Sequence, residues 1–338
     1  MQVQLKSSKV NFIGDPHFGK KFPDVPLHRR GEREAAQSKE FLKQLTTDAD
    51  ICIMVGDLFD TFLVSNEVLF EVYSILKLAA EQNPKREFLM MEGNHDIARN
   101  DDTITSFDIL VKMLTRYENI HFFQKTDVFN TTRGERILLC PYAEFSTAEA
   151  EVEPYANETF DLAVGHWDTD EVAGPHNLVP LGLLAKMTPL IVTGHVHTQE
   201  TRTIKWVHPE NGLQTSEFYR TGSMLPYSHG EDPEGVLYIT RTLEQIAIET
   251  SENPDVYKDK CLRVLLIGDE QPPVDLNTLQ FSVKRIDSLP KEKMEVNMET
   301  FSFEALWRES FAENNVTPEL TEHYWEQYKQ KATHDSES

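Results

Sequence analysis

The amino-acid sequence predicts an α/β fold, in which one large domain of strands and helices is followed by smaller units. Short apolar runs rich in Val, Ile and Phe recur along the chain, as expected for buried strands, and the glycine at the end of each permits a sharp turn. Between them lie stretches in which apolar residues recur at helical spacing. The chain also has 338 residues, which is too many for one small core. We therefore expect two or three structural units.

The N-terminal part of the chain carries predicted strands and helices in alternation. Helices are expected over Glu32–Leu45, Ser65–Ala80 and Thr105–Tyr117, where apolar residues recur every three or four positions. The predicted strands are the apolar run before Gly56 and the runs at Val10–Ile13, Phe88–Met91, Ile137–Leu139, Leu162–Val164 and Leu190–Thr193. These elements together form the expected large domain.

Beyond His197 the pattern changes to alternating apolar and polar residues. Runs at Glu200–Ile204, Leu213–Tyr219 and Val236–Thr240 predict antiparallel strands that form a second sheet. A polar stretch near Ser251 predicts a domain boundary at about residue 250. The predicted organisation is a large domain over 1–250, a small α+β domain over 251–300, and a C-terminal helical pair over 301–338.

The predicted helical pair, between Ser302 and Lys331, is unusually rich in aromatic residues for a polar segment. Ser302 can cap its first helix, and Thr317 with Pro318 can begin its second. Two short helices bury little by themselves. Their aromatic faces either pack back onto residues 255–300 or bind a partner.

Composition limits the function classes. The chain has 33 Lys and Arg against 56 Asp and Glu, a net charge of −23 that opposes non-specific capture of nucleic acid. This balance argues against a free-standing DNA-binding protein. Cys52, Cys140 and Cys261 are too few and too scattered for a disulfide framework, so we expect a reducing cytoplasm. No apolar run approaches the roughly 20 residues of a membrane span, so a soluble protein is expected.

One segment is basic although the chain as a whole is acidic. Its cations lie directly after the first predicted strand: Lys20, Lys21, Arg29, Arg30 and Arg33. They form either a solvated loop or a contact to the phosphate backbone of a nucleic acid beside the site described next.

Five predicted strands end in glycine followed by a residue type that binds metals. The side chains in question are Asp15, His17, Asp57, Asn94, His166, His195 and His197. We expect them at one rim of the fold, where i and i+2 pairs such as Asp15 and His17 can face the same ion. Seven oxygen and nitrogen ligands without sulfur are too many for one tetrahedral zinc, and they indicate two divalent ions. Two ions about 4 Å apart activate a shared water for phosphoester hydrolysis.

These five motifs resemble the calcineurin-like metallophosphoesterase superfamily over roughly residues 8–245. The resemblance implies a β-sandwich of two mixed sheets flanked by helices. Asp15–Gly19, Gly56–Asp60 and Gly93–Asp96 are similar in particular to SbcD-type nuclease subunits of DNA double-strand-break processing, and so is Tyr219–Ser223. Gly165-His166-Trp167 and the short C-terminal region suggest a compact, phage-encoded member acting in the host-cell cytoplasm.

The resemblance also implies a role for each site residue. Asp15, His17 and His197 would bind one ion, Asn94, His166 and His195 the other, and Asp57 would bridge them. His95 stays free of metal and suits proton donation to the leaving oxygen or stabilisation of the transition state, with Asp60 to orient it. Manganese is the usual ion of the family, although the ligands also fit magnesium, iron or zinc.

Three functions follow from these observations. The preferred one is a DNA exonuclease and endonuclease subunit that binds an SbcC-like coiled-coil ATPase through its C-terminal helices. Residues 1–250 would then be the nuclease domain, and residues 251–300 a small capping domain that contacts DNA. The resemblance also implies a homodimer through Ser65–Ala80 and Thr105–Tyr117, within a heterotetramer. The alternatives are a small-molecule or nucleotide phosphodiesterase and a non-catalytic scaffold. A complete ligand set argues against the scaffold; the diesterase fits the acidic balance but leaves residues 250–338 without a purpose.

Overall fold

The computed structural model describes residues 1–100, 103–169, 176–273 and 276–286, together with positions 317, 320, 322, 324 and 325. Two compact units are distinguished, Met1–Ile286 and Asp287–Ser338. The description below concerns the first unit. The predicted helical pair over 301–338 lies outside the described residues, apart from those five isolated positions.

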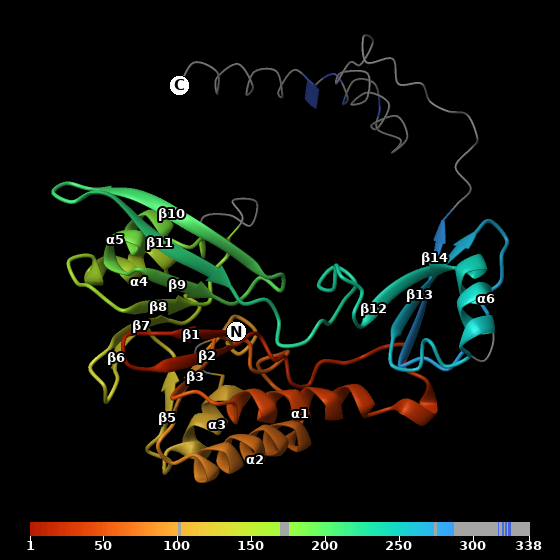
Figure 1. Ribbon diagram of the computed structural model, residues 1–338, viewed down its shortest axis with the longest axis horizontal. Coiled ribbons are helices and arrows are strands. Elements are labelled where there is room, and N and C mark those ends of the chain that lie inside the picture. Colours follow the sequence, from red (N-terminus) through yellow and green to blue (C-terminus); the bar gives the residue numbers. More distant parts are fainter. Residues whose placement is uncertain are drawn as a thin grey trace. The chain divides into compact units, whose positions relative to one another are not determined.

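Two mixed sheets form the centre of the first unit (Figure 1). The first has the order β1-β2-β3-β4-β5 and consists of β1 (Gln2–Gln4), β2 (Lys9–Ile13), β3 (Ile51–Met54), β4 (Glu87–Met91) and β5 (Ile120–Phe123). The second has the order β10-β11-β9-β8-β7-β6 and consists of β6 (Asp127–Asn130), β7 (Arg136–Cys140), β8 (Leu162–Gly165), β9 (Leu190–Thr193), β10 (Glu200–His208) and β11 (Gly212–Arg220).

The interior strands of both sheets are parallel. In the first sheet β2 to β5 run in one direction and β1 pairs antiparallel with β2. In the second sheet β7, β8, β9 and β11 are parallel, and β6 and β10 are antiparallel at the edges. Parallel strands are buried on both faces, which explains why they are continuous apolar runs in the sequence.

Alternate residues of each strand enter different cores, because side chains alternate across a sheet. Ile53 and Leu89 of the first sheet face Val164 and Val192 of the second in the core between the sheets. Met54, the neighbour of Ile53, faces the helices on the other side. The expected β-sandwich of two mixed sheets flanked by helices is confirmed.

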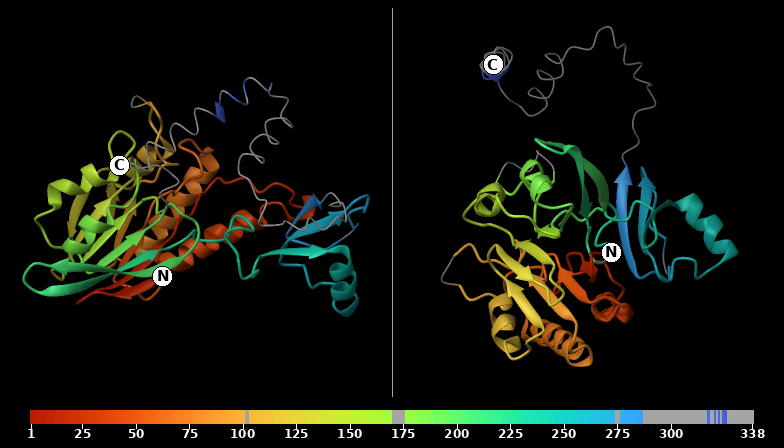
Figure 2. Two further views of the ribbon diagram at one scale, coloured as in Figure 1. Left: turned by 90° about the horizontal axis from the view of Figure 1, so that it is seen from above. Right: turned by 60° about the vertical axis from the view of Figure 1, so that its left-hand side comes forward.

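Three helices cover the outer face of the first sheet: α1 (Glu32–Leu45), α2 (Asn66–Gln82) and α3 (Ser106–Leu114). In the right-hand view of Figure 2 they lie on the side of the first sheet that faces away from the second sheet. The side chains of Ser65 and Thr105 accept hydrogen bonds at the first turns of α2 and α3 and so fix where these helices begin. The second sheet is covered by α4 (Ala148–Val152) and α5 (Leu181–Met187). None of the helices that the structure describes combines the length and apolarity of a membrane span.

The strands after His197 depart from their prediction. The first two runs form the antiparallel hairpin β10–β11, but β11 pairs with β9, so the hairpin extends the sheet that already holds β7 to β9. The third run lies in β12 (Tyr238–Thr242), which is parallel to its partner in a separate sheet. Alternation of residue types predicted the strands but could not indicate their partners.

A third, small sheet consists of β12, β13 (Cys261–Ile267) and β14 (Gln280–Ile286), all parallel, with α6 (Leu243–Glu252) packed on it. Thr242 ends β12 and caps α6 through a capping box with Gln245. β12 therefore lies before the predicted boundary at residue 250 and α6 extends across it, and both pack in the same small core as β13.

Two cations of the basic segment are structural. Arg33 is 4% exposed, and its guanidinium donates to Tyr238 Oη at 3.0 Å and to Gln280 Oε1 at 3.2 Å. Arg29 is 7% exposed and pairs with Glu32 at 2.7 Å. Arg33 thus connects α1 to the small sheet, and neither residue is free for a phosphate backbone. Lys20 differs, because it pairs with Asp60 at 3.2 Å beside the site described next.

Candidate metal centre

The carboxyl ends of five parallel strands bring the predicted site residues together. The residues that follow β2 are Asp15 and His17; Asp57 follows β3, Asn94 and His95 follow β4, His166 follows β8, and His195 and His197 follow β9. Neighbouring parallel strands end at the same edge of a sheet, and the two sheets present that edge on the same side. His17 and His197 are therefore neighbours in the fold although 180 positions separate them in the sequence.

One cluster consists of Asp15, His17, Asp57 and His197, whose nearest nitrogen and oxygen atoms all lie within 4.8 Å of one another. His17 Nε2 lies 2.9 Å from His197 Nε2 and 3.6 Å from Asp57 Oδ2. His197 Nε2 lies 3.8 Å from Asp15 Oδ2. Two imidazole nitrogens and two carboxylates thus surround one point.

A second cluster adjoins the first and shares Asp57 with it. Asp57, His166 and His195 again lie within 4.8 Å of one another. Asn94 Oδ1 is 3.0 Å from His166 Nε2 and 2.8 Å from His195 Nδ1. His166 Nε2 is 3.4 Å from Oδ1 of Asp57, whereas Oδ2 of that carboxylate faces His17. The geometry is that of two adjoining cation sites with one carboxylate between them.

Asp15 provides the test of whether a cation fits. Both of its carboxylate oxygens are buried, and no described residue donates a well-formed hydrogen bond to either. Burial accordingly raises the pKa of Asp15 to about 7. A buried carboxylate without donors is costly unless a cation lies against it. The Asp and His clusters therefore fit divalent metal ions.

The histidines agree with this interpretation. Burial lowers the pKa of His17 to about 3, and burial with the neighbouring His166 lowers that of His195 to about 4. Both rings are thus neutral, which is the form that binds a metal. Burial opposes a charge on His166 as well, but Asp57 outweighs it and raises the pKa of His166 to about 9. A metal ion at this place would replace the proton of His166.

The backbone is strained at three of the site residues. His17, Asp57 and His195 have φ values of 50°, 48° and 72°, in the left-handed region that residues other than glycine seldom occupy. Such strain costs on the order of 1–3 kcal/mol per residue and persists where the surrounding structure imposes it, commonly at functional sites. Here the left-handed backbone conformation directs the three side chains toward the shared centre.

The motif glycines are required mainly for close approach. The sequence predicted sharp turns, yet among the five motif glycines Gly56 alone has a positive φ, of 120°. A Cβ atom at Gly93 would overlap Asp57, and one at Gly56 would overlap the ring of His166. Glycine therefore leaves the space in which side chains from neighbouring strands meet.

Asp96 fixes two of the loops that carry site residues. Its buried carboxylate accepts hydrogen bonds from the backbone N–H groups of Leu58, Phe59 and Gly93 at 2.9 to 3.1 Å. The loop of Asp57 and the loop of Asn94 are thereby held together.

Asp60 contacts His95 through its main chain. Nδ1 of the exposed His95 ring lies 2.6 Å from the carbonyl oxygen of Asp60, not from its carboxylate. The Asp60 carboxylate lies 3.5 Å from His17 Nδ1 and 3.2 Å from Lys20 Nζ. Asp60 thus orients His95 through its main chain, and its side chain faces a residue of the first cluster.

Two carboxylates that the sequence did not indicate contact the histidines from outside. Asp168 Oδ1 lies 2.9 Å from His195 Nε2, and Glu231 Oε1 lies 3.3 Å from His197 Nδ1. Glu231 also accepts a hydrogen bond from the backbone N–H of Tyr227 at 2.9 Å. A carboxylate that accepts the proton of one ring nitrogen leaves the other nitrogen's lone pair directed at the metal.

This arrangement predicts an effect on metal affinity. Replacing Asp168 by Ala removes the acceptor of His195 Nε2–H, so we expect Mn²⁺ to bind roughly 10- to 100-fold more weakly. Asp168→Asn keeps an oxygen acceptor and should lose less. Isothermal titration calorimetry measures the Mn²⁺ affinity of both variants. Asp48→Ala, which removes a fully exposed carboxylate, is the control. Unchanged affinity in Asp168→Ala would exclude the orienting role.

Comparisons with known proteins complete the description of the site. The family model described as calcineurin-like phosphoesterase matches residues 8–199, which include all seven predicted ligands. None of the curated protein sequences matches the chain. A solved structure, TT1561 of Thermus thermophilus, is similar at 10% sequence identity over 64% of this chain and 89% of that chain, with a TM-score of 0.38. Because the family model covers more than half of the sequence and all of the metal-binding motifs, the chain belongs to the calcineurin-like phosphoesterase family.

Proposed function

We propose that this phosphoesterase hydrolyses phosphodiester bonds in DNA, as the nuclease subunit of a complex with an SbcC-like coiled-coil ATPase. The observation that carries the proposal is the pair of adjoining clusters that share Asp57, with the exposed ring of His95 beside them. A metal-dependent hydrolase of this family needs such a pair, and a diester needs a proton donor for its leaving oxygen.

Each residue has a role in this proposal. Asp15, His17 and His197 would hold one ion, Asn94, His166 and His195 the other, and Asp57 both. Two bound divalent ions supply an activated water and stabilise the charge on the phosphoryl oxygens. Manganese is the proposed ion, and magnesium is the alternative, since oxygen and nitrogen ligands bind either.

His95 would deliver the proton. Its backbone N–H donates to Asp57 Oδ1 at 2.9 Å, which holds the residue beside the shared carboxylate. With Nδ1–H donating to the Asp60 carbonyl oxygen, the doubly protonated ring would donate its Nε2–H to the leaving oxygen and return to the neutral form. This arrangement supports general-acid catalysis by a residue outside the proposed ligand set.

The space beside His95 is large enough for a polynucleotide chain. An open cavity of about 810 Å³ lies against His95 and Asn94 and includes the exposed Arg99. Arg99 and Lys20 are two cationic side chains near the candidate metal centre of an otherwise acidic protein. The net charge of −23 opposes DNA binding by this subunit alone, so the proposed ATPase partner would provide much of the DNA-binding surface. A nucleotide or small-molecule phosphodiesterase is the alternative that the same charge favours.

One assay separates these functions. The protein is incubated with linear duplex DNA and Mn²⁺, with and without the ATPase partner and ATP, and released nucleotides are measured. The nuclease proposal expects release that the partner increases and a chelator abolishes. Turnover of a chromogenic diester with no attack on DNA under any of these conditions would support the small-molecule alternative instead.

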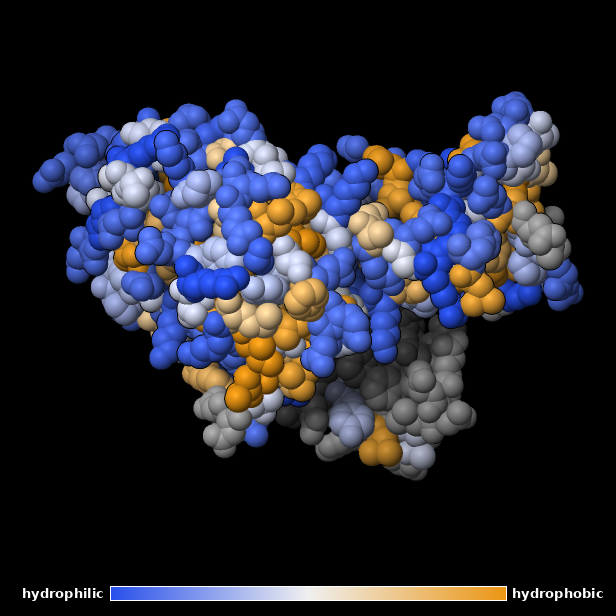
Figure 3. Space-filling view, turned by 90° about the horizontal axis from the view of Figure 1, so that it is seen from below, coloured by the Kyte–Doolittle hydropathy of each residue, from blue (hydrophilic) through white to orange (hydrophobic). Residues whose placement is uncertain are grey.

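We also propose a homodimer through an apolar face at α2 and α3, within a heterotetramer. Phe70 of α2 is 64% exposed, and Ile104, just before α3, is 68% exposed. Leu63, in the loop before α2, is 52% exposed. Figure 3 views the molecule from the side of these helices and shows an apolar area on this face. Large exposed apolar groups that gather on one face favour association.

Sedimentation tests the dimer. Wild-type protein should be dimeric at micromolar concentration, and Phe70→Glu should weaken the dimer at least about tenfold, because a charge would be buried in an apolar interface. Val207→Glu, at an equally exposed apolar residue of the β10–β11 hairpin, is the control and should leave the dimer intact. A monomeric wild-type protein would rule out this interface.

A further inference from the structure

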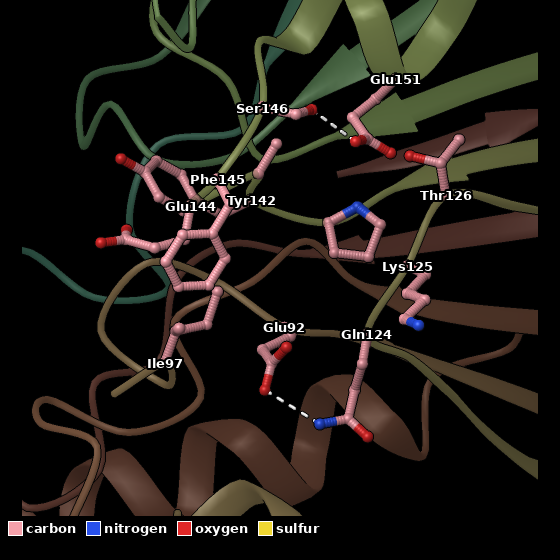
Figure 4. Close-up of a pocket in the computed structure, with 12 residues that line it drawn as sticks. Glu92, Ile97, Gln124, Lys125, Thr126, Tyr142, Glu144, Phe145, Ser146 and Glu151 are labelled. Atoms are coloured by element: carbon pink, nitrogen blue, oxygen red, sulfur yellow. Dashed lines mark hydrogen bonds between the residues drawn. The ribbon is translucent and has the colours of Figure 1, made fainter. Parts of the chain in front are cut away.

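A second cavity, of about 520 Å³, lies beside the metal centre and has no role in the proposal so far. Figure 4 shows it between the loop that follows β4 and the loop that follows β7. Glu92, Ile97, Gln124, Tyr142 and Phe145 are among the residues that line it. Ile97 and Tyr142 also line the cavity at His95, so the two cavities adjoin.

Tyr142 connects this cavity to the metal centre. Its ring centroid lies 6.1 Å from that of His195 and 6.3 Å from that of His166. Its backbone N–H donates to the Glu92 carbonyl oxygen at 3.2 Å, which ties the loop after β7 to the residue that precedes Gly93. A molecule bound in this cavity would therefore be separated from His166 and His195, two of the predicted metal-binding residues, only by the ring of Tyr142.

One wall of the cavity is apolar and aromatic. In Figure 4 the rings of Phe145 and Tyr142 and the side chain of Ile97 lie together on the same side of the cavity. Phe145 is 72% exposed although it is a large apolar residue. An aromatic face that stays in contact with water beside a phosphoester site is suited to stacking against a flat, uncharged ring.

The opposite side of the cavity is polar and mainly acidic. Gln124 Nε2 donates to Glu92 Oε1 at 3.1 Å and to Asp108 Oδ1 at 2.9 Å. Glu151 also lines the cavity away from the aromatic wall, together with one cation, Lys125, whereas Glu144 lies beside the aromatic residues in Figure 4. The excess of acidic over basic side chains in the cavity disfavours the binding of a second phosphate group. It suits a neutral ligand that carries N–H donors, because carboxylate oxygens are acceptors.

We propose that this cavity is a subsite for an unpaired nucleobase with an exocyclic amino group. The base stacks on Phe145 and Tyr142 and directs its amino group toward the acidic side, while its own phosphate lies at the metal centre. A base within a duplex has both faces covered by its neighbours, so the subsite takes a nucleotide from a single strand or an opened end. The inference rests on the proposed phosphodiesterase activity and names the substrate feature that this site selects.

The test compares diesters that differ only in the base. The full chain with Mn²⁺ is assayed on the p-nitrophenyl ester of deoxyadenosine monophosphate, on that of thymidine monophosphate and on methyl p-nitrophenyl phosphate, which has no base. We expect kcat/KM to fall in that order. Phe145→Ala should reduce the preference for the adenine ester over the methyl ester by about tenfold or more, since stacking on an aromatic ring contributes on that order.

Two variants serve as controls. Phe145→Tyr keeps the ring and should keep the preference, and Val207→Ala removes an equally exposed apolar side chain of the β10–β11 hairpin and should leave the preference unchanged. Equal kcat/KM for the adenine and methyl esters in the wild-type protein, or an unchanged ratio in Phe145→Ala, would overturn the subsite.

A binding measurement separates failure of the subsite from failure of the proposed activity. Calorimetry with Mn²⁺-bound protein compares deoxyadenosine monophosphate with inorganic phosphate and requires no turnover. Tighter binding of the nucleotide, lost in Phe145→Ala, supports the subsite even if no diester is hydrolysed. Equal binding of both ligands overturns the subsite even if diesters are hydrolysed.

Discussion

We expect replacement of His17 by Ala to abolish the proposed hydrolysis of DNA and of chromogenic diesters while the protein remains folded. The physical reason is that His17 Nε2 lies 3.6 Å from the shared carboxylate of Asp57 and 2.9 Å from His197 Nε2, within the first cluster. Without this nitrogen the first ion loses one of four ligands. Because metal ligands and the activated water act together, loss of one ion should remove the activity almost completely.

The measurement combines activity, metal content and thermal unfolding. A chelator should likewise abolish wild-type activity, with Mn²⁺ restoring it better than Mg²⁺, since a histidine-rich site suits the softer ion. Asp15→Asn separates a ligand from a packing residue. Asp15 is a buried carboxylate without a well-formed donor, so its neutral isostere should be inactive yet no less stable than the metal-free wild type. Undiminished cleavage by His17→Ala would remove the proposed metal assignment.

Replacement of His95 by Ala should slow hydrolysis by roughly 10²- to 10⁴-fold, the usual contribution of a general acid. The same variant should still bind two Mn²⁺ ions, because His95 is not among the proposed ligands. Its side chain is exposed, so we expect an unchanged melting temperature. Metal content, melting temperature and rate are measured on one preparation.

Asp60→Ala is the matched control for His95. His95 Nδ1 contacts the Asp60 carbonyl oxygen, which alanine retains, whereas the Asp60 carboxylate faces His17 and Lys20. This variant should therefore affect the first metal cluster while the proton-donating step is preserved. Normal turnover in His95→Ala, or loss of its bound metal, would contradict the assignment of His95 as a proton donor.

The sequence by itself determined the fold class and the set of side chains that meet at the centre. Each strand that carries a site residue is a local apolar run, and local runs are visible without a structure. The carboxyl ends of parallel strands share an edge, so the order of the motifs was sufficient to predict that Asp15, Asn94 and His195 approach one another.

Only the tertiary structure decided which other charges belong to the site. Asp168 and Glu231 are two of 56 acidic residues, and nothing in their neighbours distinguishes them. Their distances to His195 and His197 are set by how β8, β9 and the segment after β11 fold together. Arg33 is the opposite case: its place after the first strand predicted either a solvated loop or a phosphate contact, yet the small sheet buries it.

The motif glycines likewise show what the sequence predicts and what only the tertiary structure explains. Gly93 marked the end of a strand in the sequence, whereas the reason for glycine there is the approach of Asp57 from the neighbouring strand. Periodicity records which face of an element is buried. Which atoms occupy the space beside a residue depends on contacts between segments far apart in the chain, and those are fixed only when the sheets have assembled.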